Sequence, residues 1–131
     1  MEKQNTVIVL DDMILEVKEI LELYLSGRHI GISVISLSQN MFIAGKYRIS
    51  MDRNTDYIVL MNNVRAGWQI ATLSHQMNPL NPKFLTSAFK DATSESYGHL
   101  LIHTKASGNN LLRYRGNIFN TDFVTIYQPK N

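Results

Sequence analysis

The chain has 131 residues, of which 44% are hydrophobic and 18% charged, and its formal net charge is +2. This length suits one domain, and the composition is that of a folded globular protein rather than a disordered or membrane-spanning one. A net charge so close to zero excludes nucleic-acid binding through overall basicity. Any such binding would need a local basic patch or a ring of subunits.

Targeting signals and cysteines are both missing from the sequence. No apolar run approaches the roughly 20 residues that cross a bilayer, and the opening MEKQN is too polar for a signal peptide. We therefore expect no membrane partner and an intracellular location. The absence of cysteine excludes disulfides, thiolate metal sites and a cysteine nucleophile.

A run of β-branched and aliphatic residues from Thr6 to Leu10 ends in two carboxylates, Asp11 and Asp12. An unbroken apolar run is typical of a strand buried on both faces of a parallel sheet, and such sheets bind ligands at the carboxyl ends of their strands. We therefore expect Asp11 to bind Mg²⁺ and Asp12 to orient or deprotonate a water molecule. The alternative is a strand end whose acidic residue caps the next helix.

This pattern is typical of the Walker B motif of P-loop NTPases, but the partner motif GxxxxGK[ST] does not occur in the chain. The only Gly-Lys pair, Gly45-Lys46, is followed by Tyr47 and has Asn40 where the first glycine should stand. The sequence therefore predicts a single incomplete ATPase domain over residues 1–131.

The next elements place polar residues beside the two acids. Met13 to Leu25 has the period of an amphipathic helix, and Ile32 to Leu37 has the composition of a second strand. A strand–helix–strand order predicts a right-handed parallel crossover, so residues 38–40 should lie near the end of the first strand. The remaining expected elements are a loop with one helical turn (41–55), a third buried strand (56–61), helices (66–77 and 82–92), a fourth strand (98–103), and a hairpin or edge strands (111–115 and 123–127).

Five segments of the chain, in order and at matching spacing, resemble the FtsK/HerA superfamily of P-loop ATPases. The nearest likeness is to the DNA-packaging ATPases of Maverick/Polinton transposons, virophages and related viruses, and it extends from Thr6 to about Lys130. The matching segments are VIVLDD (7–12), GRHIGISVISLSQNMF (27–42), YIVLMNNVR (57–65), FKDATS (89–94) and YGHLLI (97–102).

The resemblance implies an α/β fold: part of a three-layer, RecA-like P-loop NTPase core with a mainly parallel sheet, followed by the hairpin or edge strands. It also implies a homo-oligomeric ring, a hexamer, that hydrolyses ATP with Mg²⁺ and pumps double-stranded DNA into a capsid. Capsid or portal proteins would be its partners. A viral or transposon origin would place the protein in the host cytoplasm or nucleus, or in the virion.

The resemblance also assigns roles to individual residues. Asp11 matches the metal-binding acid, Asp12 the water-activating position, and Gln39 the polar residue that senses the γ-phosphate or orients water. Arg65 matches an arginine that follows the corresponding strand, and it ranks ahead of Arg28 as the finger that stabilises phosphoryl charge across a subunit boundary. A turn residue at Gln39 and solvated arginines at the other two positions are the alternatives.

Two further groups of residues are open to interpretation from the sequence. Lys46, Arg48 and Arg53 belong to a basic segment that could contact DNA phosphates, although most single loop arginines are simply solvated. His99 and His103 are four residues apart on a predicted strand, a separation too large for two ligands of one metal ion. We therefore predict no zinc site there.

The missing P-loop shapes the functional hypotheses. Without it the chain alone should bind ATP weakly or not at all, and apolar sheet surface should be exposed. The leading hypothesis is the C-terminal portion of a DNA-packaging ATPase. The second is a degenerate, non-catalytic relic or an interaction module that assembles with a full-length ATPase. The third, a stand-alone nucleic-acid binder, is disfavoured by the near-neutral charge.

Overall fold

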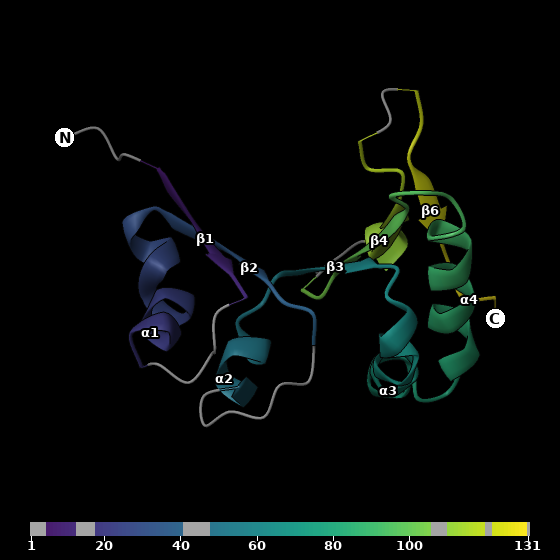
Figure 1. Cartoon of the computed structure of the whole chain (residues 1–131), viewed down its shortest axis with the longest axis horizontal. Helices are drawn as coiled ribbons and strands as arrows, with labels where there is room; N and C mark the ends of the chain where they lie inside the picture. The colour runs from purple at the N-terminus through teal and green to yellow at the C-terminus, as the bar shows by residue number, and fades with distance from the viewer. Residues whose placement is uncertain (1–4, 13–17, 41–47, 106–109, 120–121, 131) are drawn as a thin grey trace. The chain divides into compact units, whose positions relative to one another are not determined.

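The chain is an α/β protein that divides into two compact units, Met1–Thr55 and Asp56–Asn131. The computed structural model describes residues 5–12, 18–40, 48–105, 110–119 and 122–130, and each unit is described here by itself (Figure 1). None of the helices in these ranges is long and apolar enough to cross a bilayer.

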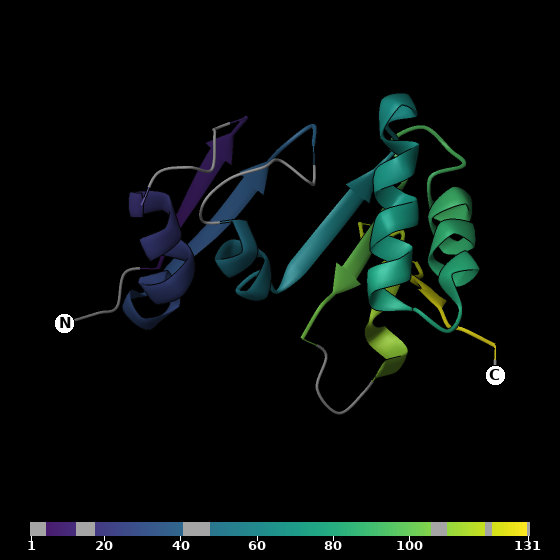
Figure 2. The same cartoon turned by 90° about the horizontal axis from the view of Figure 1, so that it is seen from below.

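The first unit contains two parallel strands, β1 (Thr6–Asp11) and β2 (Ile32–Leu37), whose arrows point the same way in Figure 2. They pair over their full lengths, because Thr6 lies opposite Ile32 and Asp11 lies opposite Leu37. The connection contains helix α1 (Lys18–Ser26) and the 3₁₀ turn η1 (Gly27–Ile30). The predicted parallel strand–helix–strand unit is therefore confirmed, while residues 13–17 of the predicted helix lie outside the described residues.

A small apolar core lies on one face of this strand pair. Leu10 of β1, Ile20 of α1 and Met51 of α2 (Arg48–Arg53) are buried together, and Ile8 and Val34 pack against them. Met51 is only 2% exposed, so the segment expected as a loop with one helical turn is a short helix that contributes to the core.

The prediction that β1 is buried on both faces is wrong. Val7 and Val9 are 59% and 56% exposed, and their neighbours on β2, Ile35 and Leu37, are each 49% exposed. The described helices of this unit pack on the face that carries Ile8 and Leu10, so the alternate side chains remain in solvent. The expected exposure of apolar sheet surface is confirmed.

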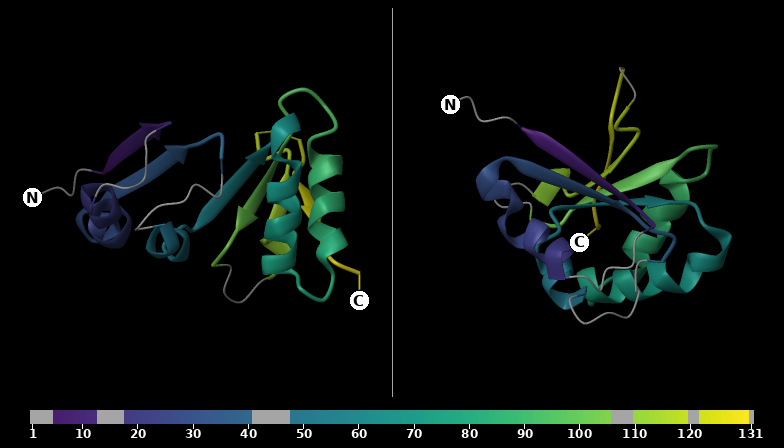
Figure 3. Two further views of the ribbon diagram at one scale, coloured as in Figure 1. Left: turned by 60° about the horizontal axis from the view of Figure 1, so that its bottom comes forward. Right: turned by 60° about the vertical axis from the view of Figure 1, so that its left-hand side comes forward.

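The second unit contains a four-stranded antiparallel sheet with helices α3 (Gly67–Met77) and α4 (Pro82–Ala92) side by side (Figure 3). All four predicted strands and both predicted helices of this region are present, but the prediction that the strand at 56–61 is buried is wrong for one of its faces, where Tyr57, Val59 and Met61 are exposed because no described helix covers them. In sheet order the strands are β3 (Tyr57–Met61), β4 (His99–His103), β5 (Tyr114–Gly116) and β6 (Thr125–Tyr127).

The prediction of a mainly parallel sheet is wrong for the described strands, because only β1 and β2 are parallel. The reason lies in the connection between β3 and β4. One helix would return the chain to the start of β3 and produce a parallel partner. Two helices in succession instead leave the chain at the end where β3 finishes, so β4 runs back antiparallel to it.

The core of the second unit lies between the two helices and one face of the antiparallel sheet. Leu85 of α4 and Leu100 and Ile102 of β4 are fully buried. Tyr114 of β5 is also buried, and its hydroxyl accepts a hydrogen bond of 2.9 Å from the Asn78 side chain in the connection between the helices. Leu60, Ile70, Leu73 and Ala88 complete the buried apolar residues.

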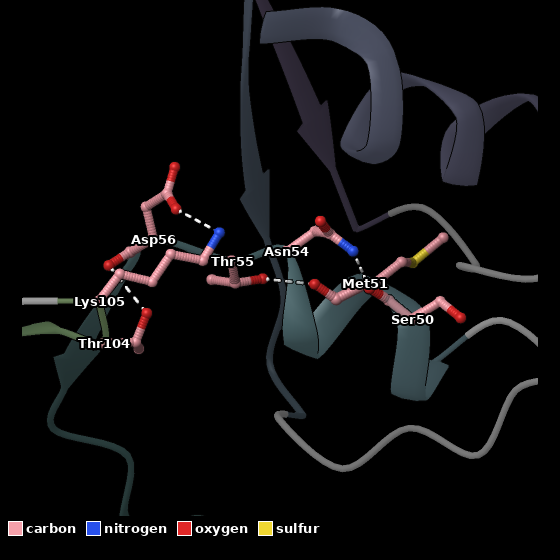
Figure 4. A network of polar contacts seen from close by, with 7 residues as sticks. All are labelled: Ser50, Met51, Asn54, Thr55, Asp56, Thr104 and Lys105. Carbon is pink, nitrogen blue, oxygen red and sulfur yellow. Dashed lines mark hydrogen bonds and ion pairs between the residues drawn. The ribbon is translucent and has the colours of Figure 1, made fainter.

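Short polar contacts fix the chain on either side of the boundary between the units (Figure 4). In the first unit, the Thr55 hydroxyl donates to the Met51 carbonyl at 2.9 Å, which satisfies an acceptor at the end of α2. In the second unit, Lys105 forms an ion pair of 2.7 Å with Asp56, and the Thr104 hydroxyl donates to the Asp56 carbonyl. The start of β3 is therefore held against the end of β4.

The turn between α4 and β4 gives a structural reason for particular residues in the block from Phe89 to Gly98. The Thr93 hydroxyl donates to the Phe89 carbonyl at 2.7 Å and ends the helix. A Cβ on Gly98 would lie 2.5 Å from the Ala92 carbonyl oxygen, so only glycine fits there. This part of the block positions β4.

Candidate functional site

The carboxyl ends of β1 and β2 bring together the residues that the sequence singled out. Asp11 is the last residue of β1 and lies opposite Leu37, the last residue of β2. The Asp12 N–H donates a hydrogen bond of 3.0 Å to the Leu37 carbonyl, which extends the pairing by one step. Because Gln39 is two residues beyond Leu37, the predicted proximity of the two acids to residues 38–40 is confirmed.

Asp12 has a left-handed backbone conformation, with φ of 50°. This region is unfavourable for residues with a side chain, although aspartate and asparagine tolerate it best. The backbone bends at Asp12, and both Asp11 and Asp12 are exposed to solvent. An unfavourable backbone conformation retained at a strand end is typical of functional sites.

The segment after β2 forms a tight turn of its own. The Ser38 hydroxyl donates to the Asn40 carbonyl at 2.8 Å and accepts from the Asn40 N–H at 3.2 Å. This arrangement holds the backbone on both sides of Gln39, whose side chain is exposed. Gln39 is therefore presented from an ordered turn at the same sheet edge as the two acids.

The chemistry of these side chains fits part of a magnesium site. Mg²⁺ takes one or two protein carboxylates and completes its octahedron with water and phosphate oxygens, so the single carboxylate of Asp11 is enough as a protein ligand. In the described ranges there is no group of three or more His, Asp or Glu residues that could enclose a metal ion by itself.

The two candidate arginine fingers lie in different places. Arg28 is exposed in η1, before β2 begins, so the length of a six-residue strand, about 20 Å, separates it from the end that carries Asp11. Arg65 follows β3 in the second unit, in the 3₁₀ turn Val64–Ala66, where its N–H donates to the Asn63 side chain at 3.1 Å. Arg28 therefore does not reach the acids of its own subunit.

The candidate DNA-contacting segment is only partly described. Lys46 lies outside the described residues. Arg48 and Arg53 are the first and last residues of α2, and Arg53 is exposed. The expected helical turn in this segment is α2, whose Met51 lies in the core, and contact of Arg48 and Arg53 with DNA stays a prediction.

One polar pair was not anticipated as a pair from the sequence. The Tyr127 hydroxyl on β6 donates a 2.6 Å hydrogen bond to the Asp91 carboxylate on α4. Burial of the phenol, reinforced by this bond and by the negative charge of Asp91, raises the pKa of Tyr127. The two residues are 36 positions apart, and the pattern of the sequence contains no signal that pairs them.

Comparison with protein-family models finds no match, and comparisons with curated proteins and with solved structures find no significant one.

Proposed function

We propose that this chain is the C-terminal part of a Mg²⁺-dependent ATPase of the FtsK/HerA type that translocates double-stranded DNA. The observation that supports this proposal is the hydrogen-bonded pair of parallel strand ends, which gathers Asp11, Asp12 and Gln39 at one edge. The phosphate-binding loop would come from a polypeptide segment that precedes this part of the core.

Each side chain has a distinct role in the proposed site. Asp11 provides carboxylate oxygens to the metal, and Mg²⁺, when bound, supplies charge neutralisation of the phosphates. Asp12 accepts a proton from the attacking water or holds it in line, and Gln39 offers an amide that can donate to a phosphate oxygen or accept from the water. Arg65 or Arg28 would act on the site of a neighbouring subunit.

The assembly and the partners follow from the family resemblance. We propose a hexameric ring around double-stranded DNA, acting with capsid or portal proteins in the host cytoplasm or nucleus, or in the virion. A RecA-like core would be completed when the preceding segment packs on the exposed residues of β1 and β2.

Complementation tests the catalytic part of this proposal. The coding DNA upstream should contain a strand, GxxxxGK[ST] and a helix, and the segment fused to this chain should hydrolyse ATP. Asp11→Asn and Asp12→Asn should each lower the rate by a factor of about 100 or more, because each removes a group that acts on the reacting atoms. Glu19→Gln, an exposed acid of α1, is the matched control and should have no effect.

A binding measurement on the chain alone separates metal binding from catalysis. Mn²⁺ should broaden the amide NMR signals of residues 11, 12 and 39 in the wild type and much less in Asp11→Asn. Equal broadening in both proteins would contradict the metal-binding role of Asp11, whatever the fused protein does.

A second function is supported by the exposed apolar side chains of β1 and β2. The chain could serve as a non-catalytic module that assembles with a full-length ATPase through this surface. In that case the fused protein would assemble but would not hydrolyse ATP.

A further inference from the structure

The antiparallel sheet has one face that α3 and α4 do not cover, here called the outer face. Side chains alternate along each strand, so the register identifies its members: every second residue points away from the buried Leu60, Leu100 and Ile102. The outer face includes Tyr57, Val59 and Met61 of β3, His99 and His103 of β4, and Arg115 of β5.

The charge on the outer face has one sign. Arg115 lies opposite Leu101 in the middle of the sheet, and Arg113 is the residue that precedes β5. The Arg113 carbonyl accepts a 2.8 Å hydrogen bond from the His103 N–H, so Arg113 lies next to the end of β4. None of the residues in β3–β6 that point to this face is acidic, and the face is therefore complementary to an anionic ligand.

Two nitrogens on this face are buried but have no hydrogen-bond partner: Nε2 of His99 and Nε of Arg115. The other ring nitrogen of His99 lies 3.3 Å from the Tyr97 carbonyl oxygen, which suits a proton on Nδ1. Buried polar atoms are normally paired, so the Arg115 N–H is available for an acceptor such as a water molecule or an anionic ligand. Phosphate oxygens are acceptors that match a guanidinium.

Aromatic rings lie beside the imidazole rings of His99 and His103. Tyr57 stacks on His103 with ring centroids 4.5 Å apart and an interplanar angle of 18°, yet it remains 54% exposed. Phe119 is 85% exposed and its ring tilts against His99 at 5.4 Å. An anionic peptide would use the arginine but not the flat faces of these rings, whereas unpaired nucleobases use both.

We propose that the outer face binds a single-stranded segment of nucleic acid, with a phosphate at Arg115 and bases stacked on Tyr57 and Phe119. Four strands span about 14 Å, which accommodates two or three bases, the number that open four-stranded sheets bind in other proteins. This inference goes beyond the proposed ATPase, because it concerns different residues from those near Asp11 and needs no nucleotide hydrolysis.

Fluorescence anisotropy with the full chain and a labelled oligothymidine of about 10 nucleotides tests the proposal. Binding should be measurable below about 0.1 mM protein, the weak limit of non-specific nucleic-acid binding at physiological salt. A duplex of the same length should bind more weakly, because its bases are not free to stack on the rings. Absence of binding up to that concentration, or stronger binding of the duplex, would overturn the proposal.

Two variants distinguish the contribution of the Arg115 charge to binding from the contribution of base stacking on Tyr57. Arg115→Gln should weaken binding about tenfold and reduce the slope of log K against log[salt] by about 0.7, the value for one single-strand phosphate contact. Tyr57→Leu should weaken binding by a similar factor without changing the slope, because stacking releases no counterions. The matched control is Lys90→Gln, which removes the same charge from exposed α4 and should leave affinity unchanged.

Folding of the variants is checked by circular dichroism, and NMR on the wild-type chain provides evidence that needs no variant. Oligothymidine should shift the amide signals of β3, β4 and β5 and leave those of α4 in place. Equal loss of affinity in Arg115→Gln and Lys90→Gln, displacement of the oligonucleotide by polyglutamate at equal concentration, or shifts confined to the first unit would each contradict the proposal.

Discussion

At the scale of single residues, Asp12 combines an unfavourable backbone conformation with a proposed catalytic role. Its φ of 50° lies in the region where a Cβ is disfavoured and glycine is not. Asp11, one residue earlier, is in an extended strand, where glycine is the less stable choice. The two neighbours should therefore respond in opposite ways to the same pair of substitutions.

We expect Asp12→Gly to be more stable than Asp12→Ala by about 1 kcal/mol, because glycine adopts the left-handed conformation without strain. At position 11 the order should reverse, with Asp11→Ala more stable than Asp11→Gly by about 0.5–1 kcal/mol. Urea denaturation of the four variants measures both differences. If alanine were the more stable residue at both positions, Asp12 would not have the left-handed conformation.

At the scale of elements, the hydrogen bond between Tyr127 and Asp91 ties β6 to α4 at a distance of 2.6 Å. The raised pKa of Tyr127 means that the folded protein keeps the phenolic proton at a pH where the unfolded chain has released it. The stabilising contribution is therefore complete below about pH 10, the pKa of tyrosine in unfolded chains, and decreases as the pH rises above that value.

Tyr127→Phe should lower the free energy of unfolding by about 1 kcal/mol near neutral pH, because the hydrogen bond is lost. The difference from the wild type should shrink between about pH 9 and about pH 11, since the variant cannot release the proton. Urea denaturation across this range measures it. Tyr97→Phe, at a side chain that is 91% exposed, is the control whose effect should not depend on pH.

Features set by neighbouring residues could be predicted from the sequence, whereas features set by contacts between distant residues could not. Apolar periodicity located α4 and β3 to within one residue, and the order of elements predicted the parallel pairing of β1 with β2. The same reasoning did not predict the antiparallel sheet, because pairing direction depends on how the helices between β3 and β4 pack. It also did not predict that Met51 is buried, since Ile49 and Met51 are too few apolar residues to form a periodic pattern.

Some features of the candidate site could be predicted from the sequence and others could not. The sequence predicted that Asp11 and Gln39 meet at one edge, because parallel strands have a defined direction. The left-handed conformation of Asp12 could not be predicted from the residue type, because aspartate also occurs in ordinary turns. The outer face of the antiparallel sheet could not be identified before the register of β4 and β5 was known, because Arg115 and His99 are far apart in the chain.

At the scale of the whole molecule, an uncovered apolar surface is the structural property most closely linked to the proposed function. Natural sheets limit their unpaired edges with charges, prolines or short strands. β2 has six residues without a charge or a proline, and Ile35 and Leu37 on it are about half exposed. The surface is therefore suited to contact with another polypeptide, and the isolated chain should associate with itself at high concentration.

The double substitution Val9→Thr, Ile35→Thr should reduce self-association of the isolated chain and should also weaken its packing against the proposed preceding segment. Both side chains are about half exposed, so the change should leave the thermal midpoint within a few degrees of the wild type while raising the concentration at which light scattering detects association. Leu10→Thr, one residue away on the buried face, should instead unfold the first unit. Fused to the P-loop segment, the double variant should lose ATPase activity, because the same residues would then lie in an interface that excludes water. Full activity of that fusion would mean that the proposed partner segment packs elsewhere, and the exposed strands would need a different explanation.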